Sequence, residues 1–433
     1  MFVLADDLGY GDLSCYGQTR FQTPHIDRLA AEGLRFTQHY AGSTVCAPSR
    51  ACLLTGQHTG HVHQRANGNI SFRDDPRDRC IASVLQEAGY ATAMIGKSGV
   101  ASSSNDARLP NRKGFDHFFG YLSHGAAHRY YPRSLFRDGK RVAYPGNQGK
   151  RGKTYSGDLF LADALAWIED HHREPFFLHL SLQQPHLDLS VPREWKTPFL
   201  GKFKEQPLKG GHFRAEANPK ATFAGMVTYL DDTVGKVRAK LAELGVAERT
   251  LVIFSSDNGA VTAGGWSSDN MNSSGPLRGC KRDLYEGGVR VPTIAWWPGV
   301  IQPNRVTDHV SAFWDFAPTV CDVAGLPPMP GADGLSYLPT LRGEPSQPKH
   351  EYLYWEFYEQ GGKQAVRRGD WKGVRLGVLK NPAAKMELYD LAKDLGEQQD
   401  VADQHPEVVR QLMAIMREAH VPSDRYRMPM APE

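Results

Sequence analysis

Short apolar runs alternate with longer amphipathic stretches along most of this 433-residue chain, and this alternation restricts its fold more than any other feature. The runs contain few polar residues, as expected of strands that are covered on both faces. We predict strands at 1–5, 91–95, 176–182 and 251–255, and helices at 81–88, 158–171 and 223–244. Strands separated by helices favour βαβ units. The expected fold class is therefore α/β, with a large mixed, mostly parallel sheet sandwiched by helices.

Both ends of the chain carry additional signals. A helix is predicted to begin at Thr23-Pro24, because Thr23 can act as N-cap and Pro24 suits the first turn. Residues 1–5 read as the end of a buried strand, which predicts that this N-terminal strand is truncated and that further residues precede Met1. From about Leu335 the pattern changes to short strands at 352–358, 365–368, 371–376 and 387–389 and a helix at 406–419. We expect a main domain at 1–335 and a small α+β subdomain at 336–433.

Composition excludes several classes of protein. The 51 Lys and Arg residues nearly balance the 48 Asp and Glu residues, and a net charge of +3 does not predict nucleic-acid binding. The six cysteines include no CxxC pair, which argues against a structural zinc site. No apolar run approaches the length of about 18 residues that a membrane-spanning helix requires. The number of subunits cannot be predicted from the sequence.

Polar side chains follow each of the four predicted strands. They are Asp6-Asp7, Lys97, His186 and Asp257-Asn258. Because ligands bind at the carboxyl edge of open α/β sheets, we expect these groups to form one site. Carboxylate and amide oxygens suit Ca²⁺ or Mg²⁺ better than zinc. Taken separately, an Asp-Asp pair can also be a solvated loop, and Asp-Asn-Gly is a common turn.

Residues 44–56, TVCAPSRACLLTG, place a cysteine where a helix is predicted to begin. Pro48 fits an early helical position, so Cys46 would lie at the helix N-terminus, where backbone N–H groups favour negative charge. An alternative interpretation is a small buried cysteine with a packing role.

The sequence of this segment resembles that of a known family. Residues 46–50 read CAPSR, with LTG at 54–56, and resemble the C-x-P-S-R…T-G element of the formylglycine-dependent sulfatases, which have an alkaline phosphatase-like fold. Similar matches follow along nearly the whole chain. They are ADDLGYGD at 5–12, TPHIDRLA at 23–30, GY at 89–90, GK at 96–97, DNG at 257–259, LRGCK at 277–281, EGGVRVP at 286–292 and LYDL at 388–391.

This resemblance implies the hydrolysis of sulfate esters. A maturation enzyme that generates formylglycine would oxidise Cys46 to an aldehyde, whose hydrate attacks sulfur and forms a covalent sulfo-enzyme. The resemblance also implies the site residues. Asp6, Asp7, Asp257 and Asn258 would bind the metal, with Ca²⁺ favoured and Mg²⁺ possible. Arg50 would orient the hydrate, Lys97 and Lys281 would neutralise the sulfate oxygens, and His186 would protonate the leaving group.

Two segments bear on the substrate. Many family members have a histidine two residues after the sulfate-binding lysine, whereas this chain has Gly99, and a water or another histidine could fill the space. Residues 120–132 resemble a segment of bacterial glycan sulfatases, so His124 and His128 are candidates for binding a sulfated carbohydrate, although an aromatic loop that packs on the core is an equal alternative. An aryl sulfate is the other substrate considered. The resemblance implies a periplasmic or secreted location for the full-length form.

Two other functions stay open at this point. A phosphodiester or phosphonate monoester hydrolase of the same superfamily could use the same metal and nucleophile. A glycan-binding homologue that has lost catalysis is the second alternative, but the presence of Cys46, Arg50 and Lys97 argues against it.

Overall fold

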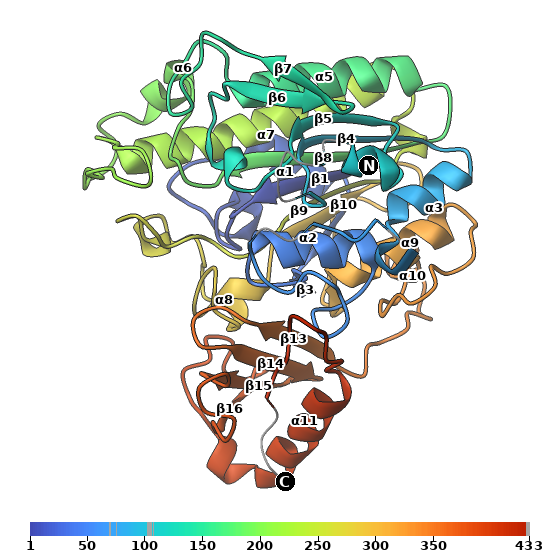
Figure 1. Cartoon of the computed structure of the whole chain (residues 1–433), viewed down its shortest axis with the longest axis vertical. Coiled ribbons are helices and arrows are strands. Elements are labelled where there is room, and N and C mark those ends of the chain that lie inside the picture. The colour runs from blue at the N-terminus through green and yellow to red at the C-terminus, as the bar shows by residue number, and fades with distance from the viewer. Residues whose placement is uncertain (69–70, 75, 102–105, 107, 430–433) are drawn as a thin grey trace.

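A mixed sheet forms the centre of the computed structural model, which describes residues 1–68, 71–74, 76–101, 106 and 108–429 (Figure 1). Within these residues the sheet has ten strands in the order β11-β2-β10-β9-β1-β8-β4-β5-β6-β7, and the central five, from β9 to β5, are parallel. The strands are β1 Phe2–Asp6, β2 Leu34–Phe36, β4 Ala91–Lys97, β5 His117–Tyr121, β6 Ser134–Arg137, β7 Lys140–Ala143, β8 Phe176–Pro185, β9 Val252–Ser256, β10 Thr293–Trp296 and β11 Arg305–Thr307. The predicted mixed, mostly parallel sheet is confirmed.

Helices cover both faces of this sheet (Figure 1). Strand β1 shows why, because Phe2 and Leu4 enter one hydrophobic core whereas Val3 and Ala5 enter the other. The first core includes side chains of α2 Cys46–Thr55, α3 Ile81–Glu87 and α9 Phe316–Val323. The second includes side chains of α1 Pro24–Ala31, α5 Ser156–His171 and α7 Pro219–Glu243. Shorter elements connect these layers: α4 Leu109–Arg112, α6 Arg193–Lys196, α8 Glu286–Val289, α10 Leu338–Arg342, and the strand pair β3 His39–Tyr40 and β12 Ser311–Ala312.

The predicted capping of α1 by Thr23 is wrong, although the helix begins where it was expected. The Thr23 side chain accepts from Ser14 N–H at 2.9 Å and donates to Asp27 at 3.1 Å, and it makes no cap bond. Instead, Asp231 of α7 accepts the backbone N–H groups of His25 and Ile26 at 3.2 and 2.7 Å. A carboxylate beside the first turn satisfies the same N–H groups and adds a favourable charge, so the cap comes from another helix.

The C-terminal residues form a separate antiparallel sheet. Its strands are β13 Leu353–Phe357, β14 Lys363–Arg368, β15 Trp371–Leu376 and β16 Met386–Asp390, and α11 Pro406–Glu418 packs on one face. The other face meets the main domain, where Trp355 joins the first core and its indole N–H donates to Ala41 O at 3.0 Å. The expected small C-terminal lobe is therefore present, and the boundary between residues 335 and 336 stays a prediction.

Among the described helices, none combines the length and the hydrophobicity that crossing a membrane requires.

Candidate active site

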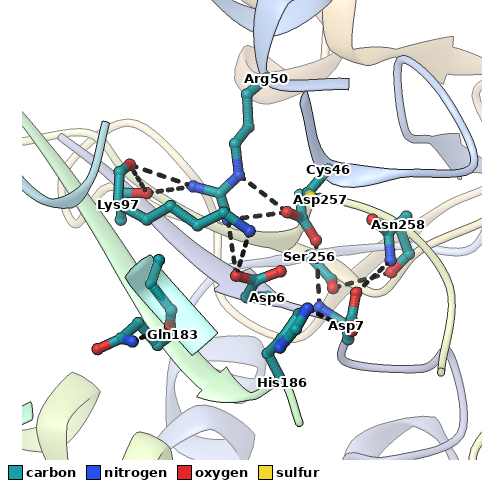
Figure 2. Close-up of polar contacts among 12 residues, drawn as sticks. Asp6, Asp7, Cys46, Arg50, Lys97, Gln183, His186, Ser256, Asp257 and Asn258 are labelled. Atoms are coloured by element: carbon teal, nitrogen blue, oxygen red, sulfur yellow. Dashed lines mark hydrogen bonds and ion pairs between the residues drawn. The ribbon is translucent and has the colours of Figure 1, made fainter. Parts of the chain in front are cut away.

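The carboxyl ends of four adjacent parallel strands bring polar side chains together at one edge of the sheet (Figure 2). Asp6 is the last residue of β1, and Lys97 is the last residue of β4. His186 and Asp257 come directly after β8 and β9. All four side chains are almost fully buried. Because parallel strands carry their ends to the same edge, residues far apart in the sequence become neighbours here.

The turn after β1 holds two of these strand ends together. Asp7 has a φ of 66°, a left-handed conformation that is uncommon for any residue other than glycine. In this conformation its backbone N–H donates to Asp257 Oδ1 at 3.1 Å, and the next N–H, that of Leu8, donates to Ser256 Oγ at 2.9 Å. The backbone conformation at Asp7 thereby ties the loop after β1 to the loop after β9.

Cys46 is the first residue of α2, so its side chain lies at the N-terminal end of that helix. The helix ends at Gly56, which has a φ of 70° as a left-handed C-cap. The side chain of Cys46 is only 3% exposed, yet it lines a cavity of about 480 Å³. Its Sγ and carboxylate oxygens of Asp6 and Asp257 all lie within 4.8 Å of one another. A nucleophile formed at this position would therefore face both carboxylates.

The oxygen atoms around Cys46 fit a divalent cation. Among the described residues, Asp6 Oδ1 and Asn258 Oδ1 are buried and accept no hydrogen bond. The Asn258 amide is oriented by its nitrogen, which donates to Asp7 Oδ1 at 2.8 Å and to Gly259 O at 2.9 Å. Unpartnered buried oxygens are costly unless a ligand satisfies them. Asp6, Asp7, Asp257 and Asn258 could therefore hold a hard cation such as Ca²⁺ or Mg²⁺.

Three buried cationic side chains face the three carboxylates. Lys97 Nζ donates to Asp6 Oδ2 at 2.7 Å, and Lys281 Nζ donates to Asp7 Oδ1 at 2.6 Å. The guanidinium of Arg50 reaches Asp257 Oδ2 through Nε at 2.9 Å and Nη2 at 2.8 Å (Figure 2). The formal charges of these six groups cancel, so a divalent cation would leave the site positive. A positive site suits an anionic ester.

These ion pairs perturb the protonation of the carboxylates and lysines. Burial alone would raise the pKa of Asp6, but Lys97 and His186 hold it well below its ordinary value. Burial together with the Asp6 carboxylate raises the pKa of Asp257 to about 7. Burial would lower the pKa of Lys281, yet the Asp7 carboxylate raises it above the ordinary value. Lys281 is therefore a permanent cation at the site.

Four histidines line the same cavity, and three of them, His124, His128 and His186, were predicted as site residues. The Nε2 atom of His186 lies 3.4 Å from Asp7 Oδ2, and its ring stacks on that of His128 with centroids 4.3 Å apart. Both ring nitrogens of His124 are buried and have no hydrogen-bond partner among the described residues. Burial lowers the pKa of all three histidines. His124 therefore offers an unused donor and acceptor to a bound molecule.

The space beside Gly99 contains the side chain of Arg50. Gly99 has a φ of 72°, and a Cβ atom built there would lie 3.0 Å from Arg50 Cβ and 3.1 Å from Arg50 Cδ. Glycine at this position thus allows the backbone after β4 to approach the stem of Arg50 closely.

Sequence reasoning missed several residues of this site. Ser181 of β8 donates to Lys97 O at 2.7 Å and also contacts Arg50, and Asn67 contacts the first residues of α2. His212, Phe213 and Arg282 line the cavity. Ser181 falls within the apolar run that predicts a strand at 176–182, but this pattern assigns it no role. Asn67 and Phe213 lie in loops without a motif, so no local signal distinguishes them.

Comparisons with known proteins agree with this geometry. The family model described as "Sulfatase" matches residues 1–326, and "N-sulphoglucosamine sulphohydrolase, C-terminal" matches residues 280–421. The chain is 29% identical to N-acetylgalactosamine-6-O-sulfatase of Bacteroides thetaiotaomicron, over 96% of this chain and 92% of that protein. It is 32% identical to human arylsulfatase A, over 95% of this chain and 85% of that protein.

A solved structure has a similar fold. The crystal structure of Ps i-CgsB in complex with k-i-k-neocarrahexaose has a TM-score of 0.81 and 25% identity, and covers 96% of this chain and 91% of that chain. Family model, relatives and fold coincide over the residues that form the site. The chain belongs to the sulfatase family.

Proposed function

We propose that this sulfuric ester hydrolase removes sulfate from a carbohydrate, with Cys46 matured to formylglycine. The observation that carries the proposal is the position of Cys46 at the start of α2, within 4.8 Å of carboxylate oxygens of Asp6 and Asp257. The matured residue would supply a nucleophilic hydroxyl, and a divalent cation would supply the charge that makes it more acidic. The remaining chemistry falls to the side chains of this chain.

Asp6, Asp7, Asp257 and Asn258 would hold the cation. Three buried oxygens of these residues, Asp6 Oδ1, Asp7 Oδ2 and Asn258 Oδ1, accept no hydrogen bond from the described residues, which supports this role. We propose Ca²⁺, because it accepts several carboxylate and amide oxygens in flexible geometry, and Mg²⁺ is the alternative.

Arg50, Lys97 and Lys281 would bind and orient the ester. Arg50 is held between Asp257 and the Lys97 carbonyl, so its guanidinium can position the residue at 46. Lys97 donates to Asp6 and Lys281 donates to Asp7, and both lysines could donate to nonbridging sulfate oxygens as charge develops on them.

His186 would protonate the leaving oxygen. Its Nδ1 faces the backbone carbonyl of Leu187, an arrangement that needs a proton on Nδ1. The Nε2 atom lies toward the cavity, 3.4 Å from Asp7 Oδ2, and can protonate the leaving alkoxide once the ring has bound a second proton there.

A sugar is the proposed substrate because of the cavity, of the relative named N-acetylgalactosamine-6-O-sulfatase and of the solved complex with k-i-k-neocarrahexaose. His124 and His128 border the cavity beside Cys46, and Phe213 adds an aromatic side chain. Neither ring nitrogen of His124 has a hydrogen-bond partner within the described part of the chain, so both could bond to sugar hydroxyls, and an aromatic ring can pack on the apolar face of a sugar. Sulfated galactosamine and carrageenan oligosaccharides are the first compounds to test, given the names of the relative and of the solved complex.

The proposal also includes a maturation enzyme and a location in the cell. A formylglycine-generating enzyme must act on residues 46–50. Because sulfated polysaccharides are found outside the cytoplasm, we propose a periplasmic or secreted location, which fractionation of the native host with an antibody would test.

The decisive experiment joins maturation to turnover. The protein is co-expressed with a formylglycine-generating enzyme, and the mass of the tryptic peptide that contains Cys46 is measured. We expect a loss of about 18 Da, the difference between a thiol CH₂SH and an aldehyde CHO. Sulfate release is then measured with N-acetylgalactosamine 6-sulfate, carrageenan oligosaccharides and an aryl sulfate.

Two controls separate the alternatives. Cys46→Ala should bind the substrate and release no sulfate, and a matched aryl phosphodiester should turn over more slowly than the aryl sulfate. Faster turnover of the phosphodiester would favour the phosphodiesterase alternative. Full maturation without release of sulfate from any compound would contradict the proposal and favour a glycan-binding protein.

A further inference from the structure

A loop that follows α2 returns to the start of that helix and brings Asn67 next to Cys46. The Asn67 Oδ1 atom accepts the backbone N–H of Ala47 at 3.1 Å and lies 3.6 Å from Cys46 Sγ, which donates to it. We propose that Asn67 is a positioning residue that orients the nucleophile, and that Glu359 of the C-terminal lobe holds Asn67 in place. The catalytic part of this inference rests on the proposed function.

The start of α2 needs an acceptor from outside the helix. The N-cap residue, Val45, has no side-chain acceptor, and Val45 and Ala47 are both fully buried. The first N–H groups of a helix have no partner within the helix, and leaving one unpaired in a buried place is costly. Asn67, 20 residues after Ala47, supplies that acceptor through its side chain.

Asn67 also completes the surroundings of the sulfur atom. Carboxylate oxygens of Asp6 and Asp257 lie on the side of Cys46 that faces the proposed metal site. The Asn67 amide oxygen is a neutral acceptor in addition to these charged ones. An oxygen that accepts a hydrogen bond from a thiol can accept one from a hydroxyl at the same position. Asn67 would therefore hold one hydroxyl of the matured residue and fix the direction of the other.

The position of Asn67 depends on the C-terminal lobe. Glu359, in the turn between β13 and β14, accepts the backbone N–H of Asn67 through Oε1 at 3.0 Å. Its Oε2 lies 3.7 Å from Nε of Arg282, which lines the same cavity. Lys363 of β14 donates to the Arg282 carbonyl at 2.6 Å. The lobe therefore supports two parts of the cavity wall without contributing a reacting atom.

The first test uses the unmatured thiol and needs no enzymatic activity. Protein expressed without the maturation enzyme is treated with iodoacetamide, which loses iodide as sulfur bonds to its CH₂ group and the thiol proton passes to water. Alkylation of Cys46 is followed by peptide mass. In Asn67→Ala the S–H group of Cys46 loses a neutral acceptor, so Cys46 should be alkylated about fivefold faster than in the unchanged protein. This ratio of rates corresponds to the net free energy of one neutral hydrogen bond. Asn67→Asp keeps an acceptor but adds negative charge, and should react more slowly than the unchanged protein.

The second test uses the matured enzyme. Asn67→Ala should lower kcat about 10- to 100-fold with little change in KM, because a misdirected nucleophile slows the chemical step. Asn67→Asp should retain most of kcat and raise KM for the anionic ester. The formylglycine content and Tm of both variants are measured, so that a failure of maturation or folding is recognised.

The third test examines the support from the lobe. Glu359→Ala should reproduce the loss of kcat, and Glu359→Gln should restore much of it, because an amide oxygen can still accept the Asn67 N–H. Glu351→Ala is the matched control, since this acidic side chain of the same lobe is exposed.

The outcomes are separable. Unchanged alkylation of Cys46 in Asn67→Ala would overturn the inference whatever the enzyme does. A kcat within twofold of the unchanged enzyme would overturn its catalytic part. If the fully matured protein releases no sulfate from any substrate, the proposed function fails, while the order of alkylation rates still decides the placement of Asn67.

Discussion

Replacing Gly99 by alanine should destabilise the protein and slow its reaction through Arg50. The new Cβ would lie 3.0 and 3.1 Å from Arg50 Cβ and Cδ, which is closer than side-chain carbons normally pack. Alanine in the left-handed conformation costs about 1–2 kcal/mol, and forcing extra volume into a filled space typically adds about 1–3 kcal/mol. We expect the free energy of unfolding to fall by about 2–5 kcal/mol.

Gly89→Ala is the matched control for this change. Gly89 also has a positive φ, 85°, but no atom of the residues that the structure describes lies within 4 Å of its built Cβ. It should show the cost of the backbone conformation alone, about 1–2 kcal/mol, and unchanged turnover. In Gly99→Ala, displacement of Arg50 should lower kcat about tenfold, because small errors in the position of reacting groups are costly.

Urea denaturation of both variants measures the free energies, and steady-state kinetics on the matured proteins measures kcat. The reasoning fails if the two variants lose equal stability, or if Gly99→Ala keeps its full kcat. Either result would mean that Arg50 can move aside at no cost.

Three further results are expected. Removal of divalent cations with EDTA should abolish turnover and lower Tm, with recovery on adding Ca²⁺, because an ion that binds the folded state stabilises it; full activity after exhaustive chelation would contradict the proposed ligands. His186→Asn should slow the hydrolysis of a sugar sulfate far more than that of a nitrophenyl sulfate, whose leaving group needs no proton; equal losses on both substrates would remove His186 as the acid. Burial raises the pKa of Asp12 from 3.8 to about 7, so the folded protein keeps a proton that the unfolded chain releases, and the contribution of Asp12 to the free energy of unfolding should decrease between about pH 4 and 7. Asp12→Asn should reduce this slope in urea titrations at several pH values, and an unchanged slope would show that Asp12 is not its source.

Much of the fold could be predicted from local patterns. The predicted strands at 91–95 and 176–182 correspond to β4 and β8, and the strand at 371–376 has the observed bounds of β15. Apolar runs of this kind report burial on both faces, which is a local property. The expectation for Thr23 failed because the acceptor that caps α1 belongs to Asp231, which no local pattern could reveal.

In the candidate site too, local sequence patterns predict some residues and not others. Asp6, Lys97 and Asp257 could be nominated because each ends or follows a strand, and strand ends are visible in the sequence. The contacts of Asn67 with α2 and with Glu359 could not, since Glu359 lies 292 residues away from it.

By itself, the sequence determined the α/β class, the order of the motifs and the placement of polar groups at strand ends, because short-range periodicity and residue chemistry encode these features. Only the tertiary structure decided which charges meet. Lys281 reaches Asp7 across 274 residues and Arg50 reaches Asp257 across 207. Ion pairs and buried hydrogen bonds depend on distances of a few ångströms, and the packing of the sheet sets those distances for residues that are remote along the chain.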